Sequence, residues 1–230
     1  MMKRDFPKNR YKHGKQDKAI NLKVFAAMLN KAKQLIEEGK IRKYDLLTVQ
    51  SFLAILYWSG LRKTEVTGAT PHRYVLPTCK SHSEEIVKHT EAIPGILKED
   101  IELRGDTLFI HAVARKRGSR KGDLEIWIEF PFADLILKQW KNIKPAKRVW
   151  PISEWDSWNI VKQIELKKYP HFFRFNRITE MCANPEMSVA DICNWTGLTP
   201  QTVNKYMERS GRFIHSAAEK MKRQFLKHIG

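Results

Sequence analysis

The sequence is short of cysteine and of long apolar runs, and each shortage argues against a class of protein. Its three cysteines, Cys79, Cys182 and Cys193, are odd in number and show no CxxC spacing, which argues against a disulfide framework and a zinc site. No apolar stretch approaches the roughly 20 residues that a membrane-spanning helix needs. The basic N-terminus lacks the apolar core of a signal peptide. These absences predict a cytoplasmic protein.

Acidic residues are also scarce, because 25 Asp and Glu face 42 Lys and Arg in a chain of 230 residues with a formal net charge of +17. An excess of this size indicates a polyanionic partner, either nucleic acid or an anionic membrane surface. Since the apolar runs are missing, we favour nucleic acid. The length suffices for one large domain, or one domain with an appendage. We expect the domain at residues 19–230, with a flexible basic arm at residues 1–18, although a solvated tail would have the same composition.

Apolar periodicity predicts an α+β domain that is mostly α-helical and has a small antiparallel sheet. Helices are expected near residues 21–38, 44–59, 132–145 and 171–183, and an amphipathic one near residues 212–228. Strands are expected at residues 100–103, 107–114 and 124–130. The second helix is apolar nearly all round, so it should be buried, and Gly60 suits a left-handed C-cap at its end.

Two stretches are harder to assign from periodicity. Residues 68–95 are punctuated by prolines and predict a long insert without regular structure, apart from a short helix around Ser83–Thr90. Trp150, Trp155 and Trp158 lie within nine positions. They could stack on nucleic-acid bases, but packing against the core is more common for tryptophan, and we expect it here.

Basic residues crowd the hairpin tip between the second and third expected strands. Five of the seven residues from Arg115 to Lys121 are Lys or Arg. Such a tip is usually a solvated turn, but this density favours contact with phosphates. The candidate DNA-binding residues lie at this tip, beside the late motif described next, and beside a late tyrosine: Arg115, Arg117, Arg120, Lys121, Arg177 and Lys205.

The residues with the clearest chemistry lie late in the chain. His171 and Arg174 are three apart, a spacing that puts both side chains on one face of a helix. A guanidinium beside an imidazole suits a phosphate. Tyr206 follows 32 residues after Arg174, and Arg62 lies just beyond the buried helix, at the start of the next one. Arg62 alone is better explained as an ordinary surface arginine, but the four residues together could cut a phosphodiester without metal.

The order of these motifs resembles the catalytic domain of the tyrosine recombinases, the phage-integrase family. The matching parts are Gly60-Leu-Arg62-Lys-Thr-Glu65, the strands with their basic hairpin, His171-x-x-Arg174, and Tyr206. The resemblance covers most of residues 20–210. It implies a site-specific enzyme that cuts and rejoins double-stranded DNA through a 3′-phosphotyrosine link. It further implies that no metal, ATP or other cofactor is needed, and that the protein acts as a homo-oligomer, a tetramer on DNA.

The resemblance also implies the catalytic residues, which are Arg62, Lys116, His171, Arg174 and Tyr206. The two arginines would hold the scissile phosphate, the tyrosine would attack it, and the histidine would assist proton transfer. The lysine, at the end of the second expected strand, would be the general acid, with Lys121 as the fallback. Glu65 matches an acidic position that supports the first arginine.

Three features depart from the family's usual pattern. Leu198 stands where the family usually has His or Trp after a glycine, and Tyr206 comes about one residue early. Trp195 is a candidate to replace the missing side chain in space. The insert at residues 68–95 is longer than usual, and only the basic arm stands where the family normally has a DNA-clamping domain. The helix near residues 212–228 could dock onto a neighbouring subunit or pack within its own chain.

Two other interpretations stay open. In a helix-turn-helix regulator, Cys193, Gly197 and Val203 would be the small, glycine and β-branched residues of the motif. That hypothesis explains the charge but not the phosphate-binding residues. The second is a recombinase-fold protein that binds DNA without cutting it, which Leu198 would fit. A type IB topoisomerase would share the chemistry, but the site-specific branch fits the chain length and motif spacing better.

Overall fold

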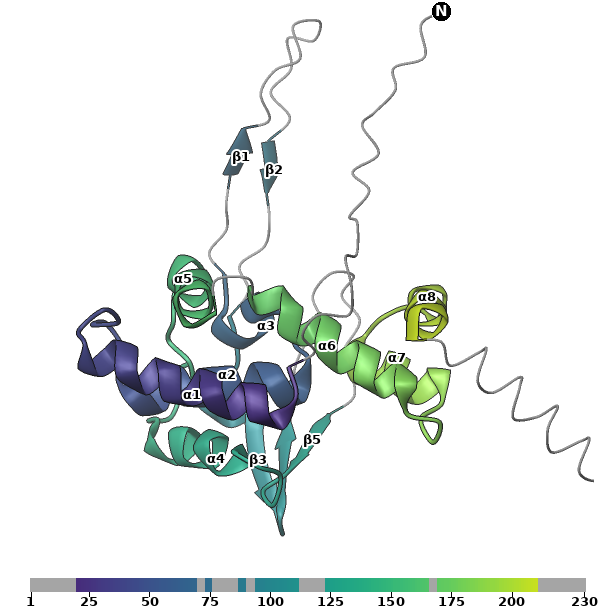
Figure 1. The fold of residues 1–230 in the computed structure, drawn as a ribbon, viewed down its shortest axis with the longest axis horizontal. Coiled ribbons are helices and arrows are strands. Elements are labelled where there is room, and N and C mark those ends of the chain that lie inside the picture. Colours follow the sequence, from purple (N-terminus) through teal and green to yellow (C-terminus); the bar gives the residue numbers. More distant parts are fainter. Residues whose placement is uncertain are drawn as a thin grey trace, which may run out of the picture.

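Helices make up most of the structure, and a small sheet lies at one end (Figure 1). The computed structural model describes residues 20–69, 73–75, 87–89, 94–111, 123–165 and 169–210. The helices are α1 (Leu22–Glu37), α2 (Leu46–Ser59), α3 (Lys63–Thr67), α4 (Ala133–Asn142), α5 (Glu154–Ile164), α6 (Pro170–Ala183), α7 (Val189–Thr196) and α8 (Pro200–Ser210). The strands are β1 (Arg73–Val75), β2 (Val87–His89), β3 (Ile101–Arg104), β4 (Thr107–Ile110) and β5 (Leu124–Trp127), with a 3-10 turn, Lys98–Asp100, before β3. The predicted fold class is confirmed.

The core is built around α2, whose side chains are buried without a break from Ser51 to Ser59. Asp45 caps its N-terminus, because the carboxylate accepts a hydrogen bond from the backbone N of Thr48 at 2.7 Å. Gly60 ends it in the left-handed conformation, with φ of 61°. Helices α1, α4 and α6 pack against it. The predicted buried helix is therefore confirmed, and it gives the residues that follow it a rigid base.

Strands β3, β4 and β5 form an antiparallel sheet in that order. Ile110 of β4 pairs with Ile101 of β3 and with Leu124 of β5. Every second residue of β4 and β5 is buried, so one face of the sheet joins the core. The predicted strands are present, but two are shorter than expected: β4 ends at Ile110, and β5 ends at Trp127. Residues 112–114 of the second predicted strand lie outside the described residues. After β5 the chain turns, and the backbone N of Phe130 donates to the carbonyl of Trp127 at 3.0 Å.

The insert at residues 68–95 contains an antiparallel ribbon of β1 and β2, which projects from the helices (Figure 1). The prediction of a short helix around Ser83–Thr90 is wrong at residues 87–89, which form β2. Pairing with β1 overrides the local helical pattern there. The ribbon leaves the domain through a narrow neck. A Cβ on Gly95 would lie 2.6 Å from the backbone N of Gly68, and both glycines have positive φ, 78° and 80°. Because glycine has no Cβ, it allows the two backbone segments to approach this closely.

Helices α6, α7 and α8 pack together around a second apolar cluster, made of Ile178, Met181, Cys182, Ile192, Val203 and Met207. Helix α6 begins with Pro170, a residue suited to the first helical position. Helix α7 begins with a capping box. Ser188 Oγ accepts from the backbone N of Asp191 at 3.1 Å, and the Asp191 carboxylate accepts from the backbone N of Ser188 at 2.9 Å. Gly197 ends α7 with φ of 63°.

Three sequence predictions fall outside the described residues: the basic arm at residues 1–18, the hairpin tip at residues 115–121 and the helix near residues 212–228. They stay predictions, as do the domain limits drawn from them. In the described parts of the chain, no helix combines the length and the apolar character that crossing a membrane requires.

Candidate active site

Arg174 lies at the centre of the candidate site and is only 2% exposed. Its Nη1 donates to the carbonyl of Gly60 at 2.9 Å, and its Nη2 donates to the carbonyl of Thr196 at 2.8 Å. These carbonyls lie at the C-terminal ends of α2 and α7, where backbone oxygens lack helical partners and carry partial negative charge. One guanidinium thus joins two helix ends. Each Nη carries a second hydrogen that can be donated to a ligand.

Glu65 links Arg174 to the second candidate arginine. Its carboxylate accepts from the backbone N of Arg62 at 2.7 Å and from Arg62 Nη1 at 2.9 Å. The carboxylate oxygen Oε2, which accepts from the backbone N of Arg62, also lies 3.9 Å from Arg174 Nη1. The side chain of Glu65 is 3% exposed, whereas that of Arg62 is 30% exposed. A buried carboxylate therefore holds two guanidiniums side by side, and one of them reaches solvent. This is the geometry that the predicted supporting role of Glu65 requires.

Burial and the neighbouring charges act on Arg174 in opposite directions. Burial lowers the pKa of Arg174, the carboxylate of Glu65 raises it, the charge of Arg62 lowers it, and Tyr206 raises it. An arginine stays protonated in proteins because its guanidinium is a very strong base. The two arginines and the carboxylate together leave the site with one net positive charge.

His171 stands in the first turn of α6, one helical turn before Arg174, as its spacing predicted. The residue is exposed at the surface, but the protein around its ring is dense enough to change its pKa. Partial burial lowers the pKa of His171, and the charges of Arg174 and Arg62 lower it further. The neutral imidazole is therefore favoured near neutral pH, and a neutral imidazole can accept a proton.

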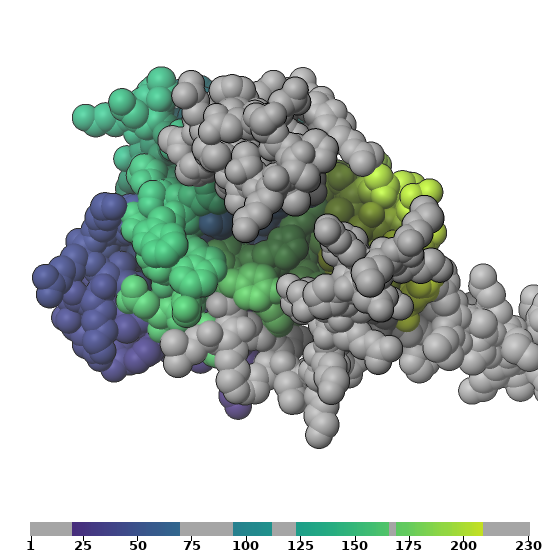
Figure 2. Space-filling view, turned by 90° about the horizontal axis from the view of Figure 1, so that it is seen from above, coloured from purple at the N-terminus to yellow at the C-terminus, as the bar shows by residue number. Residues whose placement is uncertain are grey.

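Tyr206 lies on α8, half-buried, with its ring 5.7 Å from that of Phe175 on α6. Tyr206 also raises the pKa of Arg174, although less than burial lowers it. Seen from above, the face between α5 and α8 is recessed, with α6 in the recess (Figure 2). The candidate site therefore combines residues from three elements: Arg62 at the start of α3, His171 and Arg174 on α6, and Tyr206 on α8.

Trp195 and Leu198 support the site without entering it. The indole Nε1 of Trp195 donates to the carbonyl of Ser59 at 3.0 Å, which fixes α7 to the end of α2. Tryptophan has a single donor, so Trp195 does not supply the replacement donor that the sequence suggested. The backbone N of Leu198 donates to Thr196 Oγ1 at 3.2 Å, and its side chain packs on the apolar cluster of α6, α7 and α8.

Arg177 occupies a position that the sequence did not anticipate. Its guanidinium lies between the rings of Trp58, at 5.3 Å, and Trp195, at 6.0 Å, and its Nη1 is 3.5 Å from Glu180 Oε2. Its Cβ and Cγ would each lie 3.2 Å from a Cβ on Gly60. Arg177 therefore braces the turn that presents the Gly60 carbonyl, an arrangement different from the surface DNA contact predicted for it. Only the tertiary packing could have revealed this.

The remaining candidates divide into two groups. Lys205 is exposed on α8 and free to meet a ligand. The residues of the hairpin tip lie outside the described parts of the chain, namely Arg115, Lys116, Arg117, Arg120 and Lys121. Their roles as general acid and DNA contacts stay predictions.

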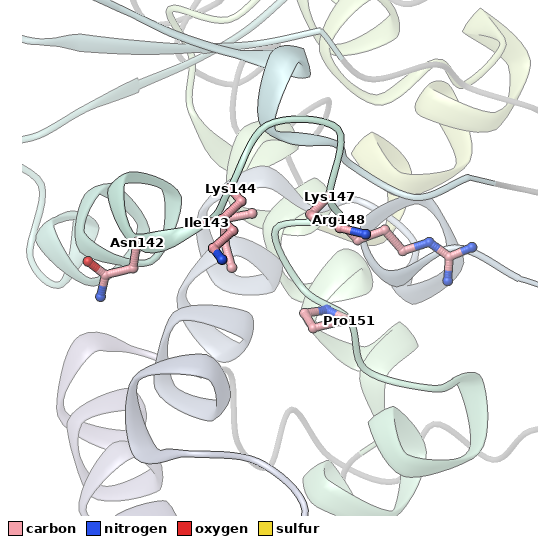
Figure 3. Close-up of a pocket in the computed structure, with 6 residues that line it drawn as sticks. All are labelled: Asn142, Ile143, Lys144, Lys147, Arg148 and Pro151. Carbon is pink, nitrogen blue, oxygen red and sulfur yellow. The ribbon is translucent and has the colours of Figure 1, made fainter.

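A shallow pocket of about 460 Å³ lies elsewhere, where α4 ends, and none of the residues discussed above lines it. Its lining residues are Asn142, Ile143, Lys144, Lys147, Arg148 and Pro151 (Figure 3). Arg148 points away from Lys144, and its Nη1 donates to the carbonyl of Thr67 at 3.4 Å. Within the described ranges, no group of three or more His, Cys, Asp or Glu side chains could hold a metal ion.

The arrangement of helices and sheet is the fold of the tyrosine recombinase catalytic domain. The chain is similar in structure to the XerH site-specific recombinase bound to a palindromic difH substrate in a post-cleavage complex, with a TM-score of 0.54 and 11% identity over 93% of this chain and 56% of that one. It is also similar to XerH bound to difH in a pre-cleavage complex (TM-score 0.50, 11% identity, 81% of this chain and 49% of that one). The XerA recombinase gives a TM-score of 0.50 and 12% identity over 93% of this chain and 66% of that one.

The similarity is structural rather than sequential. No protein-family model matches the chain, and no curated protein matches its sequence. The chain spans about half to two thirds of the length of these recombinases. At 11 to 12% identity, the comparisons establish the fold.

Proposed function

We propose that this protein is a tyrosine-type site-specific DNA recombinase that cuts and rejoins DNA through a covalent link to Tyr206. The observation that carries the proposal is the pair of arginines held by one buried carboxylate: Glu65 contacts both Arg62 and Arg174. Two fixed guanidiniums match the oxygens of a phosphodiester. His171 and Tyr206 complete the set that such a reaction needs.

The proposed reaction makes one bond to phosphorus and breaks another. The hydroxyl oxygen of Tyr206 forms a bond to phosphorus, and the bond from phosphorus to the 5′ oxygen breaks. The tyrosine proton passes to a base, for which the neutral imidazole of His171 is suited, and the departing 5′ oxygen takes a proton from the hairpin lysine, Lys116 or Lys121. A 5′ hydroxyl later attacks the phosphotyrosine and reverses each step. Because the bond energy is retained in that link, rejoining needs no ATP.

Electrostatics account for much of the expected acceleration. Attack on the phosphodiester adds negative charge to the non-bridging oxygens, and the site already carries one net positive charge from Arg62, Arg174 and Glu65. Since the guanidiniums are fixed before DNA arrives, no reorganisation is needed when the charge develops. Preorganised donors of this kind are each worth about 10²- to 10³-fold in rate.

A DNA-binding relative without cleavage is the second candidate, and the geometry of Trp195 favours it. Its only donor is bound to the Ser59 carbonyl, and Leu198 offers no polar side chain where the family usually has one. A site with one donor fewer would bind the phosphate but stabilise the transition state less. The helix-turn-helix hypothesis is weaker, because it gives no role to the linked arginines.

A covalent-trapping assay tests the proposal. Duplexes would first be selected from a random library by binding to Tyr206→Phe protein, and the selected site would then be nicked so that cleavage releases a short fragment. The unmodified protein would be incubated with this substrate in EDTA and run on a denaturing gel. A covalent protein–DNA band is the expected result. If the protein acts as a tetramer, the covalent band should appear only at protein concentrations that also give slowly migrating multi-subunit complexes with DNA on native gels.

Two variants make the assay specific. Tyr206→Phe should abolish the band. Tyr169→Phe is the matched control, because Tyr169 is 47% exposed and lies two residues before His171, and it should keep the band. A band that survives in Tyr206→Phe would assign the nucleophile elsewhere. Tight binding to the selected site with no band in any protein would favour the inactive relative.

A further inference from the structure

Helix α5 presents an aromatic stripe to solvent, made of Trp155, Trp158 and Lys162. Trp155 is 70% exposed, its ring lies 5.9 Å from that of Trp158 at an interplanar angle of 24°, and Lys162 Nζ lies 4.5 Å above the Trp158 ring. The spacing of three and four residues puts them on one side of the helix. The buried residues of α5 are Ser157, Ile160, Val161 and Ile164, which lie on the opposite side. The stripe therefore points away from the core.

The exposure of Trp155 overturns the expectation that this group of tryptophans packs in the core. Trp150 does so: it is fully buried, and its Nε1 donates to Ser51 Oγ at 3.0 Å. Trp155 does not, because the helix turns it outward. Single exposed apolar side chains are common on protein surfaces. Two stacked indoles beside a lysine combine a flat aromatic surface with a cation, and this combination suits a nucleotide.

The stripe borders the candidate active site. Lys63, the residue after Arg62, donates to the carbonyl of Glu154 at 3.0 Å and lies 3.3 Å from its carboxylate. Glu154 directly precedes Trp155 and lies on the same flank of α5 as Trp158. Helix α5 also packs against α6, which carries His171. In Figure 2, α5 forms the rim of the recess that faces α8.

The charges around the stripe suit a polyanion. The two carboxylates in the first turn of α5 are both paired with lysines, Glu154 with Lys63 and Asp156 with Lys43 at 2.9 Å. The ammonium of Lys162 lies on the stripe itself. A DNA strand that approaches the stripe thus meets compensated carboxylates and a cation beside two aromatic rings.

We propose that the stripe binds one nucleotide of the DNA strand next to the scissile phosphate. Trp155 would stack on its base, and Lys162 would pair with its phosphate. This inference rests on the proposed function for its partner, DNA, but not on cleavage. The bases of an intact duplex hide their faces, whereas strand cleavage and exchange expose unpaired bases. The stripe should therefore prefer DNA with unpaired bases beside the bound site.

The experiment compares Trp155→Ala with Trp127→Ala. Trp127 is 55% exposed on β5 and stacks on Phe130 at 6.1 Å, so it is a matched exposed tryptophan away from the site. Both changes would be made in Tyr206→Phe protein, so that bound DNA is not cut. Fluorescence anisotropy would give the dissociation constant for a selected duplex and for the same duplex with a short unpaired gap. Circular dichroism would check that both variants are folded.

Trp155→Ala should weaken binding to gapped DNA by about tenfold or more and binding to the intact duplex much less. Trp155→Phe, which keeps a stacking ring, should restore most of the loss, and Trp127→Ala should change neither. Lys162→Gln should weaken binding to both DNAs and reduce the salt dependence of binding by about one unit of slope. Equal affinities for Trp155→Ala and Trp127→Ala protein would overturn the proposal. So would a Trp155→Ala effect confined to self-association in sedimentation, which would make the stripe a protein contact. Failure of the covalent assay alone leaves these binding results unaffected.

Discussion

Gly60 offers the sharpest test of how the site is held together. It has φ of 61°, and a Cβ there would lie 3.2 Å from both Cβ and Cγ of Arg177. Arg177 cannot retreat easily, because its guanidinium lies between Trp58 and Trp195. Gly60→Ala therefore adds two costs, backbone strain and crowding. Gly105 isolates the first cost, since its φ is 56° and nothing lies within 4 Å of a Cβ built on it.

The magnitudes follow from these contacts. Left-handed backbone costs an alanine about 1 kcal/mol, so Gly105→Ala should lower the free energy of unfolding by about that amount. Crowding in a packed region adds about 1 to 2 kcal/mol, so Gly60→Ala should lower it by about 2 to 3 kcal/mol. Urea denaturation of both variants would measure the difference. Because Arg174 donates to the Gly60 carbonyl, Gly60→Ala should also slow covalent-complex formation, by about tenfold.

Two results would refute this reasoning. If Gly60→Ala and Gly105→Ala destabilised the protein equally, Arg177 would not brace the turn. If Gly60→Ala formed the covalent complex as fast as Gly105→Ala despite a larger loss of stability, the carbonyl would not position Arg174. A double-mutant cycle with Arg177→Ala adds a check, because two residues in contact should give non-additive effects.

Three further predictions concern the charged groups. Glu65→Gln leaves two adjacent guanidiniums without their buried carboxylate. The variant should lose about 3 kcal/mol of unfolding free energy in urea denaturation and should form no covalent band. An active variant would show that the carboxylate is dispensable. Arg174→Lys cannot join both helix ends with one ammonium, so it should cost about 2 to 3 kcal/mol and fail to cleave; wild-type stability would contradict the bridging role. For His171 the folded-state pKa is lowered, so the unfolded chain binds more protons once the pH falls below about 6.5. Stability should therefore decrease with acidification below that pH in the unmodified protein and less in His171→Gln, and parallel curves for the two proteins would refute this assignment.

Local features of the fold could be predicted from the sequence. An apolar run over residues 44–59, followed by Gly60, predicted the buried helix α2, because periodicity and a C-cap depend on residues only a few positions apart. The spacing of His171 and Arg174 predicted their common face for the same reason. The order of the motifs predicted the fold class, which the structural similarity to XerH and XerA supports.

The tertiary structure alone decided how the site is assembled. Arg174 meets the carbonyl of Gly60 across 114 positions of sequence, and no local pattern encodes a contact of that separation. The same holds for Arg177, which braces Gly60 from another helix, and for the ribbon of β1 and β2, whose strands stabilise each other. Trp155 is the clearest example of what the sequence could not predict. The usual preference of tryptophan predicted that Trp155 would pack in the core with Trp150. Which face of α5 points to solvent, however, depends on what packs against the opposite face.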